Sequence, residues 1–361
     1  MDHSGGRDDR IQYLDGLRGV AISLIIGYHA FARWPDIMPY GNAFGDFPVF
    51  AFGNLGVQLF FIISGFVIFR SLEGCDSLGT FVLRRWLRLF PAMLICSLLV
   101  FATAPLFPER PAGPVDGGQL LPGITLLGPY WLSHLGVHTN SLEGSFWSLY
   151  VEVHFYLIAS VSYFLFGVRG PIIAVSLAYA LGVFVQYVPA IDTLPIAGHA
   201  IRTLVSEMGL HHFAWFLSGM FFHLFSSRGR DVRFLAAGSA VAVLSVVLAP
   251  DLPLGARIFA LVLILLFVGG MTMRPVAAIL SNRILLLLGA VSYPLYLLHE
   301  NALIAMTIKI GRLAPGMPHL LMPVVPVAVL IGTSWVIAVY GEPFVKSLIK
   351  RSMRLRQPRS I

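Results

Sequence analysis

Arg18 and His29 stand eleven residues apart in one apolar segment, LDGLRGVAISLIIGYHAFA. At about 100° per residue, eleven steps return a helix to within roughly 20° of three full turns, so both side chains lie on one face, about 16 Å apart along the axis. A guanidinium and an imidazole are costly inside a membrane and indicate function when they occur there. The pair predicts a site that extends from one side of a bilayer toward the other.

The composition is typical of a membrane protein. Of the 361 residues, 57% are hydrophobic and only 12% are charged, whereas soluble domains carry about 25% charged residues. The apolar residues form segments of about 20, the length that crosses a bilayer as a helix. We therefore expect an all-α, polytopic membrane helix bundle of about ten transmembrane helices. The predicted spans are 14–33, 50–69, 86–105, 147–166, 171–188, 203–225, 233–250, 255–272, 285–307 and 319–340.

The distribution of basic residues predicts the orientation of these spans. With the N-terminus inside, 18 lysines and arginines fall on the cytoplasmic side and six on the other. This asymmetry follows the positive-inside rule and predicts that both termini are cytoplasmic. It also explains the net charge of +7 without a nucleic acid partner. We expect a membrane domain over 1–345 and a basic cytoplasmic tail over 346–361, which contacts anionic membrane lipid.

The connection over 106–146 is much longer than the others and is predicted to be extracytoplasmic. Its proline and glycine residues prevent a continuous helix, and loops of this length are usually either functional or disordered. The apolar run over 120–135 favours a segment that lies on the membrane surface or re-enters it. A disordered connector is the alternative.

A cluster of arginines precedes the third predicted span, in LRRWLRLFP. Arg84 and Arg88 are four residues apart and share a helix face, with Arg85 beside them. Guanidinium groups match phosphate oxygens in shape and charge. The cluster therefore predicts a phosphate-binding site, although arginines at this depth also serve only to set membrane topology.

Four groups of residues, spread over nearly the whole chain, carry a further pattern. They are YLDGLRGVAISLIIGYH from Tyr13, GVQLFFIISGFVI from Gly56, RRWLRLFP from Arg84 with FWSLYVEVHFY from Phe146, and SYPLYLLH from Ser292. In type and order they resemble the acyltransferase family 3, integral membrane enzymes of ten or so helices. Family members move acyl groups, commonly acetyl from acetyl-CoA, onto carbohydrates or other exported acceptors. The resemblance implies acyl-CoA as the donor substrate and no bound cofactor.

The resemblance also implies roles for individual residues. Arg18 and His29 match the paired arginine and histidine of the family's first helix, and Glu152 matches the glutamate after its Trp-Ser-Leu signature. Val153 and His154 stand where the family often has a second acid and an amide, which leaves Glu152 as the sole acid there. The family's cytoplasmic basic motif, associated with the acyl-CoA donor, is matched by Arg84, Arg85 and Arg88.

The predicted topology places His29 and Glu152 at similar depth, near the outer ends of their helices. A carboxylate fixes the tautomer of an imidazole and stabilises its protonated form, so we expect a His29–Glu152 pair. His29 would then remove the proton of an acceptor hydroxyl as it attacks a thioester carbonyl. A covalent acyl-imidazole intermediate is the competing route, and a histidine packed at the interface is the non-catalytic alternative.

Other polar positions are expected to support this site. Arg18 contacts either the acyl-CoA donor or Asp15, three residues earlier on the same face. His299 and Tyr296 are expected to line the acceptor side. The histidines in or near the spans show no metal-ligand spacing, so no metal site is predicted. The supporting positions are Asp15, Trp147, Ser148, Tyr296 and His299.

The sequence thus predicts a membrane-bound O-acyltransferase of a bacterial cytoplasmic membrane. The acceptor hydroxyl would belong to a saccharide or lipid-linked saccharide. The alternative is a transporter or flippase of a polysaccharide precursor, in which buried Arg, His and Glu side chains line a substrate or proton path. The cytoplasmic arginine cluster and the lack of paired half-sequences favour the enzyme.

Overall fold

Helices make up all the regular structure of the part of the chain that the computed structural model describes, which is residues 11–188, 191 and 195–355. The predicted all-α class is confirmed. A helix lies at each of the ten predicted spans. These helices are α1 (Gln12–Phe31), α3 (Gly56–Glu73), α4 (Leu78–Thr103), α7 (Trp147–Phe166), α8 (Arg169–Tyr187), α10 (Phe213–Ser227), α11 (Val232–Val247), α12 (Leu254–Thr272), α14 (Arg283–Leu313) and α15 (Val324–Val336).

The chain is a multi-pass membrane protein. Among the described residues, six helical stretches are long and apolar enough to cross a membrane. A seventh is added if α13 (Arg274–Leu280) and α14, which meet at 61°, form one span. The helices α10 and α11 have only 15 and 16 residues, and α1 carries Asp15 and Arg18 in its first half. Ten spans and cytoplasmic termini therefore remain predictions.

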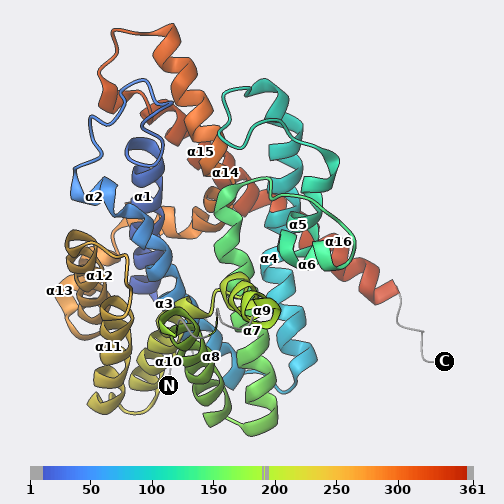
Figure 1. Ribbon diagram of the computed structural model, residues 1–361, viewed down its shortest axis with the longest axis vertical. Helices are drawn as coiled ribbons and strands as arrows, with labels where there is room; N and C mark the ends of the chain where they lie inside the picture. The colour runs from blue at the N-terminus through green and yellow to red at the C-terminus, as the bar shows by residue number, and fades with distance from the viewer. Residues whose placement is uncertain (1–10, 189–190, 192–194, 356–361) are drawn as a thin grey trace, which may run out of the picture.

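Shorter elements connect these helices. Figure 1 shows α10, α11 and α12 gathered at one side of the bundle (lower left), and α4 with α5 and α6 at the other. The short elements are α2 (Pro48–Ala51), η1 (Gly53–Leu55), η2 (Ala104–Leu106), η3 (Gly117–Gln119), α5 (Leu120–Thr125), α6 (Pro129–His134), η4 (Gly144–Phe146), α9 (Pro195–Glu207), η6 (Leu210–His212), η7 (His319–Leu321), η8 (Ile337–Gly341) and α16 (Glu342–Leu355).

The long connection over 104–146 is folded rather than a disordered connector. Its apolar run forms the two short helices α5 and α6, each of six residues, too short to cross a bilayer. Arg110 and Glu143, near its two ends, are both buried. The connection is therefore an ordered part of the bundle.

The predicted basic tail begins inside a helix. Residues 342–355 form α16, which carries Lys346, Lys350 and Arg351, and the rest of the tail, 356–361, lies outside the described residues. Glu342, the first residue of α16, accepts a hydrogen bond from Lys346 (2.8 Å) and lies 4.0 Å from Arg88 of α4. These contacts hold the start of α16 against the arginine cluster.

Two glycines allow α1 and α14 to pack backbone against backbone. A Cβ atom on Gly19 would lie 2.2 Å from the carbonyl oxygen of Leu285, and one on Gly289 would lie 1.9 Å from that of Asp15. Small residues permit this close approach of membrane helices. As a result, the second half of α1, with His29, runs beside the part of α14 that carries His299.

We expect Gly19→Ala to destabilise the protein, because the added methyl group would overlap backbone that cannot rotate away. Overpacking of this kind typically costs about 1–3 kcal/mol. The measurement is the melting temperature of detergent-purified protein. Gly332→Ala is the matched control, since a Cβ atom on this α15 glycine would meet nothing within 4 Å. Equal melting temperatures of the two variants would contradict the close contact.

Candidate active site

A cavity of about 140 Å³ lies between α1, α3, α4, α7 and α14. Three guanidinium groups and one carboxylate face it, on walls that are otherwise largely apolar or aromatic. This combination is typical of a site for an anionic ligand with an apolar part. The polar side chains that line it are Arg18, Ser64, Arg85, Arg88, Ser148, Glu152, Tyr156, Ser292, Tyr293 and Tyr296.

Arg85 and Arg88 face the cavity, whereas Arg84 does not line it. Arg85 donates a hydrogen bond to Ser71 (2.7 Å), and the Arg88 guanidinium lies 5.2 Å from the centre of the Tyr293 ring. Arg84 instead donates to the carbonyl oxygen of Gly74 (3.3 Å), at the end of α3. The face of α4 that lines the cavity therefore carries Arg85 and Arg88, which are three positions apart, and not the predicted pair Arg84 and Arg88.

Arg18 reaches the same cavity from α1. Its Nη1 donates to Oδ1 of Asp15 at 2.8 Å, so the structural partnership with Asp15 and the position beside the cavity occur together. Three of the four predicted donor-binding arginines therefore converge on one space.

Glu152 belongs to this cavity and not to the surroundings of His29. Its Oε1 accepts hydrogen bonds from Ser64 (2.5 Å) and from Tyr156 (2.6 Å). The expected His29–Glu152 pair is therefore not formed. Similar depth along two helices does not set which faces meet, and the face of α7 that bears Glu152 turns toward the middle of α3.

The carboxylate that faces His29 is Glu300 of α14. Nδ1 of His29 lies 4.0 Å from Oε1 of Glu300, and these side chains are only 11% and 10% exposed. The ring of His299 lies edge-on to that of His29, with the centres 4.7 Å apart. Two imidazoles and a carboxylate thus form a buried cluster, which we call the His29 cluster (His29, His299 and Glu300).

Hydrogen bonds join the His29 cluster to the wall of the arginine-lined cavity. Tyr296 lines that cavity, and its hydroxyl donates to the carbonyl oxygen of Ser145 (2.9 Å) and lies 2.7 Å from Oγ of Ser148. The backbone N–H of Ser145 donates to Oε2 of Glu300 (2.5 Å). His299 Nδ1 lies 2.8 Å from the carbonyl oxygen of Tyr296, so that nitrogen carries the proton. A chain of polar contacts therefore runs from the cavity to His29.

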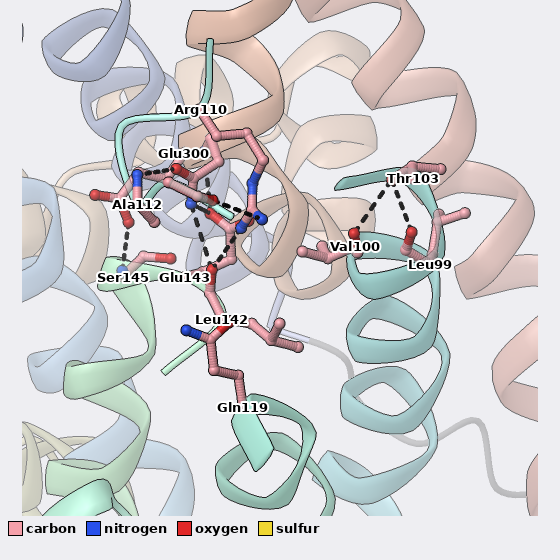
Figure 2. A network of polar contacts seen from close by, with 12 residues as sticks. Leu99, Val100, Thr103, Arg110, Ala112, Gln119, Leu142, Glu143, Ser145 and Glu300 are labelled. Atoms are coloured by element: carbon pink, nitrogen blue, oxygen red, sulfur yellow. Dashed lines mark hydrogen bonds and ion pairs between the residues drawn. The ribbon is translucent and has the colours of Figure 1, made fainter. Parts of the chain in front are cut away.

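The connection over 104–146 is clamped to α14 directly beside Glu300 (Figure 2). Oε2 of Glu143 accepts from the backbone N–H (3.0 Å) and the side-chain amide (2.7 Å) of Asn301. Arg110 lies 3.8 Å from Oε1 of Glu143 and donates to the carbonyl oxygen of Leu142 (2.9 Å). This clamp fixes the segment whose Gly144 and Ser145 lie against Glu300.

Glu143 predicts a dependence of stability on pH. Burial, and then the charge of Glu300, raise the pKa of the Glu143 carboxyl from 4.5 to about 8, against the lowering effect of Asn301 and Arg110. Between these values the folded protein holds a proton that the unfolded chain has lost. The contribution of Glu143 to the free energy of unfolding should therefore fall as the pH rises from about 4.5 to 8 and level off above that.

The check is the melting temperature of the purified protein between pH 5 and 8.5. Glu143→Gln keeps an acceptor for Asn301 but cannot titrate, so between pH 5 and 8 its melting temperature should rise relative to that of the wild type. Glu109→Gln, which removes a carboxylate paired with Arg312, is the control and should keep the wild-type slope. An unchanged slope in Glu143→Gln would contradict the proton held by Glu143.

The sequence interpretation missed Glu300, Glu143 and Arg110. Glu300 had a readable signal, because it follows His299 in an apolar helix and an ionisable residue inside a span indicates function by default. The pairing of Arg110 with Glu143 had none, because the two residues are 33 positions apart in a connection of short helices and turns. Of the supporting positions, Trp147 points away from the arginine-lined cavity and lies against the Phe61 and His212 rings. No group of metal-ligating side chains is found in the described part of the chain.

Comparison with known proteins identifies acyltransferases as the relatives of this chain. A family model described as an acyltransferase domain matches residues 11–341. The chain is similar to the acyltransferase MdmB of Streptomyces mycarofaciens, with 32% identity over 41% of this chain and 38% of the relative. It is also similar to the peptidoglycan O-acetyltransferase OatA of Listeria monocytogenes, with 27% identity over 50% of this chain and 29% of the relative. The matches thus span well under half the length of these relatives. No solved structure gives a significant match.

Proposed function

The chain belongs to the acyltransferase family 3, and from that premise we propose that it moves an acyl group, commonly acetyl, from cytoplasmic acyl-CoA to a hydroxyl of a saccharide or lipid-linked saccharide. The observation that supports this most directly is the link between two sites. An arginine-lined cavity, suited to an anionic donor, is joined through Tyr296 to a buried imidazole–carboxylate cluster.

The donor is proposed to bind at the arginines of α4. Arg85 and Arg88 would hold phosphate oxygens of acyl-CoA, for which guanidinium groups are well shaped. Arg18 lines the same cavity from α1 and would contact the pantetheine arm or the thioester oxygen. Glu152, held by Ser64 and Tyr156, would balance part of the positive charge before the donor arrives.

The proposed chemical step uses the His29 cluster. His29 takes the proton of the acceptor hydroxyl as that oxygen attacks the thioester carbonyl carbon. The C–O bond forms and the C–S bond breaks. CoA leaves as its thiolate, and the proton taken from the acceptor hydroxyl is then on the imidazole of His29. Glu300 faces Nδ1 of His29 and would stabilise the imidazolium. The two-step route through an acyl-imidazole uses the same residue as nucleophile.

We place this reaction in a bacterial cytoplasmic membrane, with ten spans and both termini inside. The support is the excess of basic residues on the side of the termini, 18 against six. In this orientation the arginines of α4 face the cytoplasm, where acyl-CoA is made, and His29 lies toward the outer end of α1. The acyl group would therefore reach an acceptor on the outer side.

Sealed membrane vesicles test donor, acceptor and direction together. Inside-out vesicles that contain the protein should transfer label from added [¹⁴C]acetyl-CoA to the saccharide fraction, and right-side-out vesicles should not, because acetyl-CoA does not cross the membrane. Vesicles without the protein are the control. Label transfer only in right-side-out vesicles would overturn the orientation. If neither kind of vesicle transfers label but a saccharide moves across the membrane, the result would favour the transporter hypothesis.

A further inference from the structure

A second cavity, of about 300 Å³, lies on the opposite face of α7 from the arginine-lined one. Trp147, Tyr150 and His154 of α7 line this second cavity, while the intervening positions Ser148 and Glu152 line the first. Helix α7 is therefore a partition between two spaces. The proposed donor site accounts for only one of them.

The walls of the second cavity combine flat aromatic surfaces with polar edges. Trp131 of α6 lines it opposite α7, and its indole N–H donates to Nε2 of His154 at 2.9 Å. Trp147 is 41% exposed, and the centre of its ring lies 5.1 Å from that of the His212 ring. Glu207 of α9 supplies an exposed carboxylate at the rim.

These walls match the chemistry of a sugar ring. A pyranose presents C–H groups on its faces and hydroxyl groups around its edge. Indole faces offer large apolar contact area, while imidazole nitrogens and a carboxylate bind hydroxyl groups. The hydrogen bond from Trp131 also fixes His154 with its proton on Nδ1. The volume is within the range of about 300–1,000 Å³ that is usual for small-molecule sites.

The start of α7 links the wall of the second cavity to the His29 cluster along the chain. Trp147 on its wall is two residues from Ser145, whose N–H donates to Glu300. Ser148, the next residue, contacts Tyr296. A ligand against Trp147 therefore sits about one helical turn from residues that contact Glu300.

We propose that this second cavity is the acceptor subsite and that it binds a pyranose ring between Trp131 and Trp147. The proposal rests on the proposed transferase function and adds to it the place where the acceptor is held. It assigns to Trp131, Trp147 and Glu207 a role in acceptor binding, separate from the arginines that hold the donor. His154 has the role of a positioning residue, because its Nε2 accepts the hydrogen bond of the Trp131 indole.

The test measures transfer from labelled acetyl-CoA while the saccharide fraction, quantified by hexose content, is varied. Trp131→Ala should raise the half-saturating saccharide concentration at least tenfold, with the KM for acetyl-CoA within twofold of the wild type. Trp131→Phe, which keeps a flat ring, should stay within about threefold. Trp335→Ala, which removes an exposed indole on α15, is the matched control and should behave as the wild type.

Glu207→Gln is a second variant, included in case Trp131→Ala misfolds. The side chain of Glu207 is exposed, so it can change without disturbing the core. The variant should raise the half-saturating saccharide concentration severalfold at an unchanged melting temperature. Wild-type saccharide dependence in Trp131→Ala and Glu207→Gln, or equal increases for saccharide and acetyl-CoA, would overturn the subsite alone. A wild-type protein that transfers no label would overturn the proposed function itself.

Discussion

His29→Ala is expected to abolish acyl transfer, with a loss of about 10²- to 10⁴-fold in kcat, the usual contribution of a general base. Glu300→Gln should cause a loss of similar size, because a neutral amide cannot stabilise the imidazolium of His29. The double variant should be no worse than His29→Ala, since residues that act as one catalytic unit are not additive.

The measurement is label transfer from acetyl-CoA by detergent-purified variants of matched concentration and melting temperature. His134→Ala, which removes an exposed histidine of α6, is the control and should retain activity. Gly144→Ala offers an independent check on Glu300, because its Cβ would lie 2.9 Å from Oε1 of that carboxylate and would displace it. Wild-type transfer by His29→Ala would remove the catalytic assignment and promote the transporter hypothesis.

The second large effect is expected at the donor site. Arg85→Gln and Arg88→Gln should each raise the KM for acetyl-CoA about 10- to 100-fold, because a hydrogen bond to a charged group contributes about 1.5–3 kcal/mol. Their kcat should change much less, since neither residue is near the His29 cluster. The effects should weaken as salt screens the phosphates of the donor.

Arg84→Gln is a matched control for these two variants. It removes the same charge from the same turn of α4, but its side chain is bound to Gly74 and does not line the cavity. Its KM should stay within about twofold of the wild type. Equal effects of the three substitutions would indicate that the cluster acts through its net charge or sets topology only. Melting temperatures of all three should match the wild type.

The sequence was sufficient to locate the helices and part of the site. Apolar segments of the right length gave all ten positions, and helical periodicity placed Arg18 and His29 on one helix. It did not predict the partner of His29, because chain order gives depth along a helix but not the direction in which a side chain points. Glu300 comes from α14, whose contact with α1 depends on Gly19 and Gly289 at positions that hydropathy does not distinguish.

The same limit applies to the arginines. Spacing along α4 favoured the pair Arg84 and Arg88, yet the rotation of that helix in the bundle turns Arg85 and Arg88 inward. Rotation is set by packing against α5, α7, α14 and α16, which is a property of the assembled structure. Residues far apart in a long connection of short helices and turns, such as Arg110 and Glu143, meet only once the helices have assembled.

The backbone contact between α1 and α14 has a mechanical consequence. Backbone contact at Gly19 and Gly289 leaves α1 and α14 little room to shift against each other, so a change in bilayer thickness that tilts membrane helices should tilt both together. The separation of His29 from Glu300 would then be insensitive to the surrounding lipid. The proposed donor and acceptor cavities are also bounded by helices outside this pair, α3, α4 and α7 among them, and have no such protection. Lipid composition should therefore change the KM values of this enzyme more than its kcat.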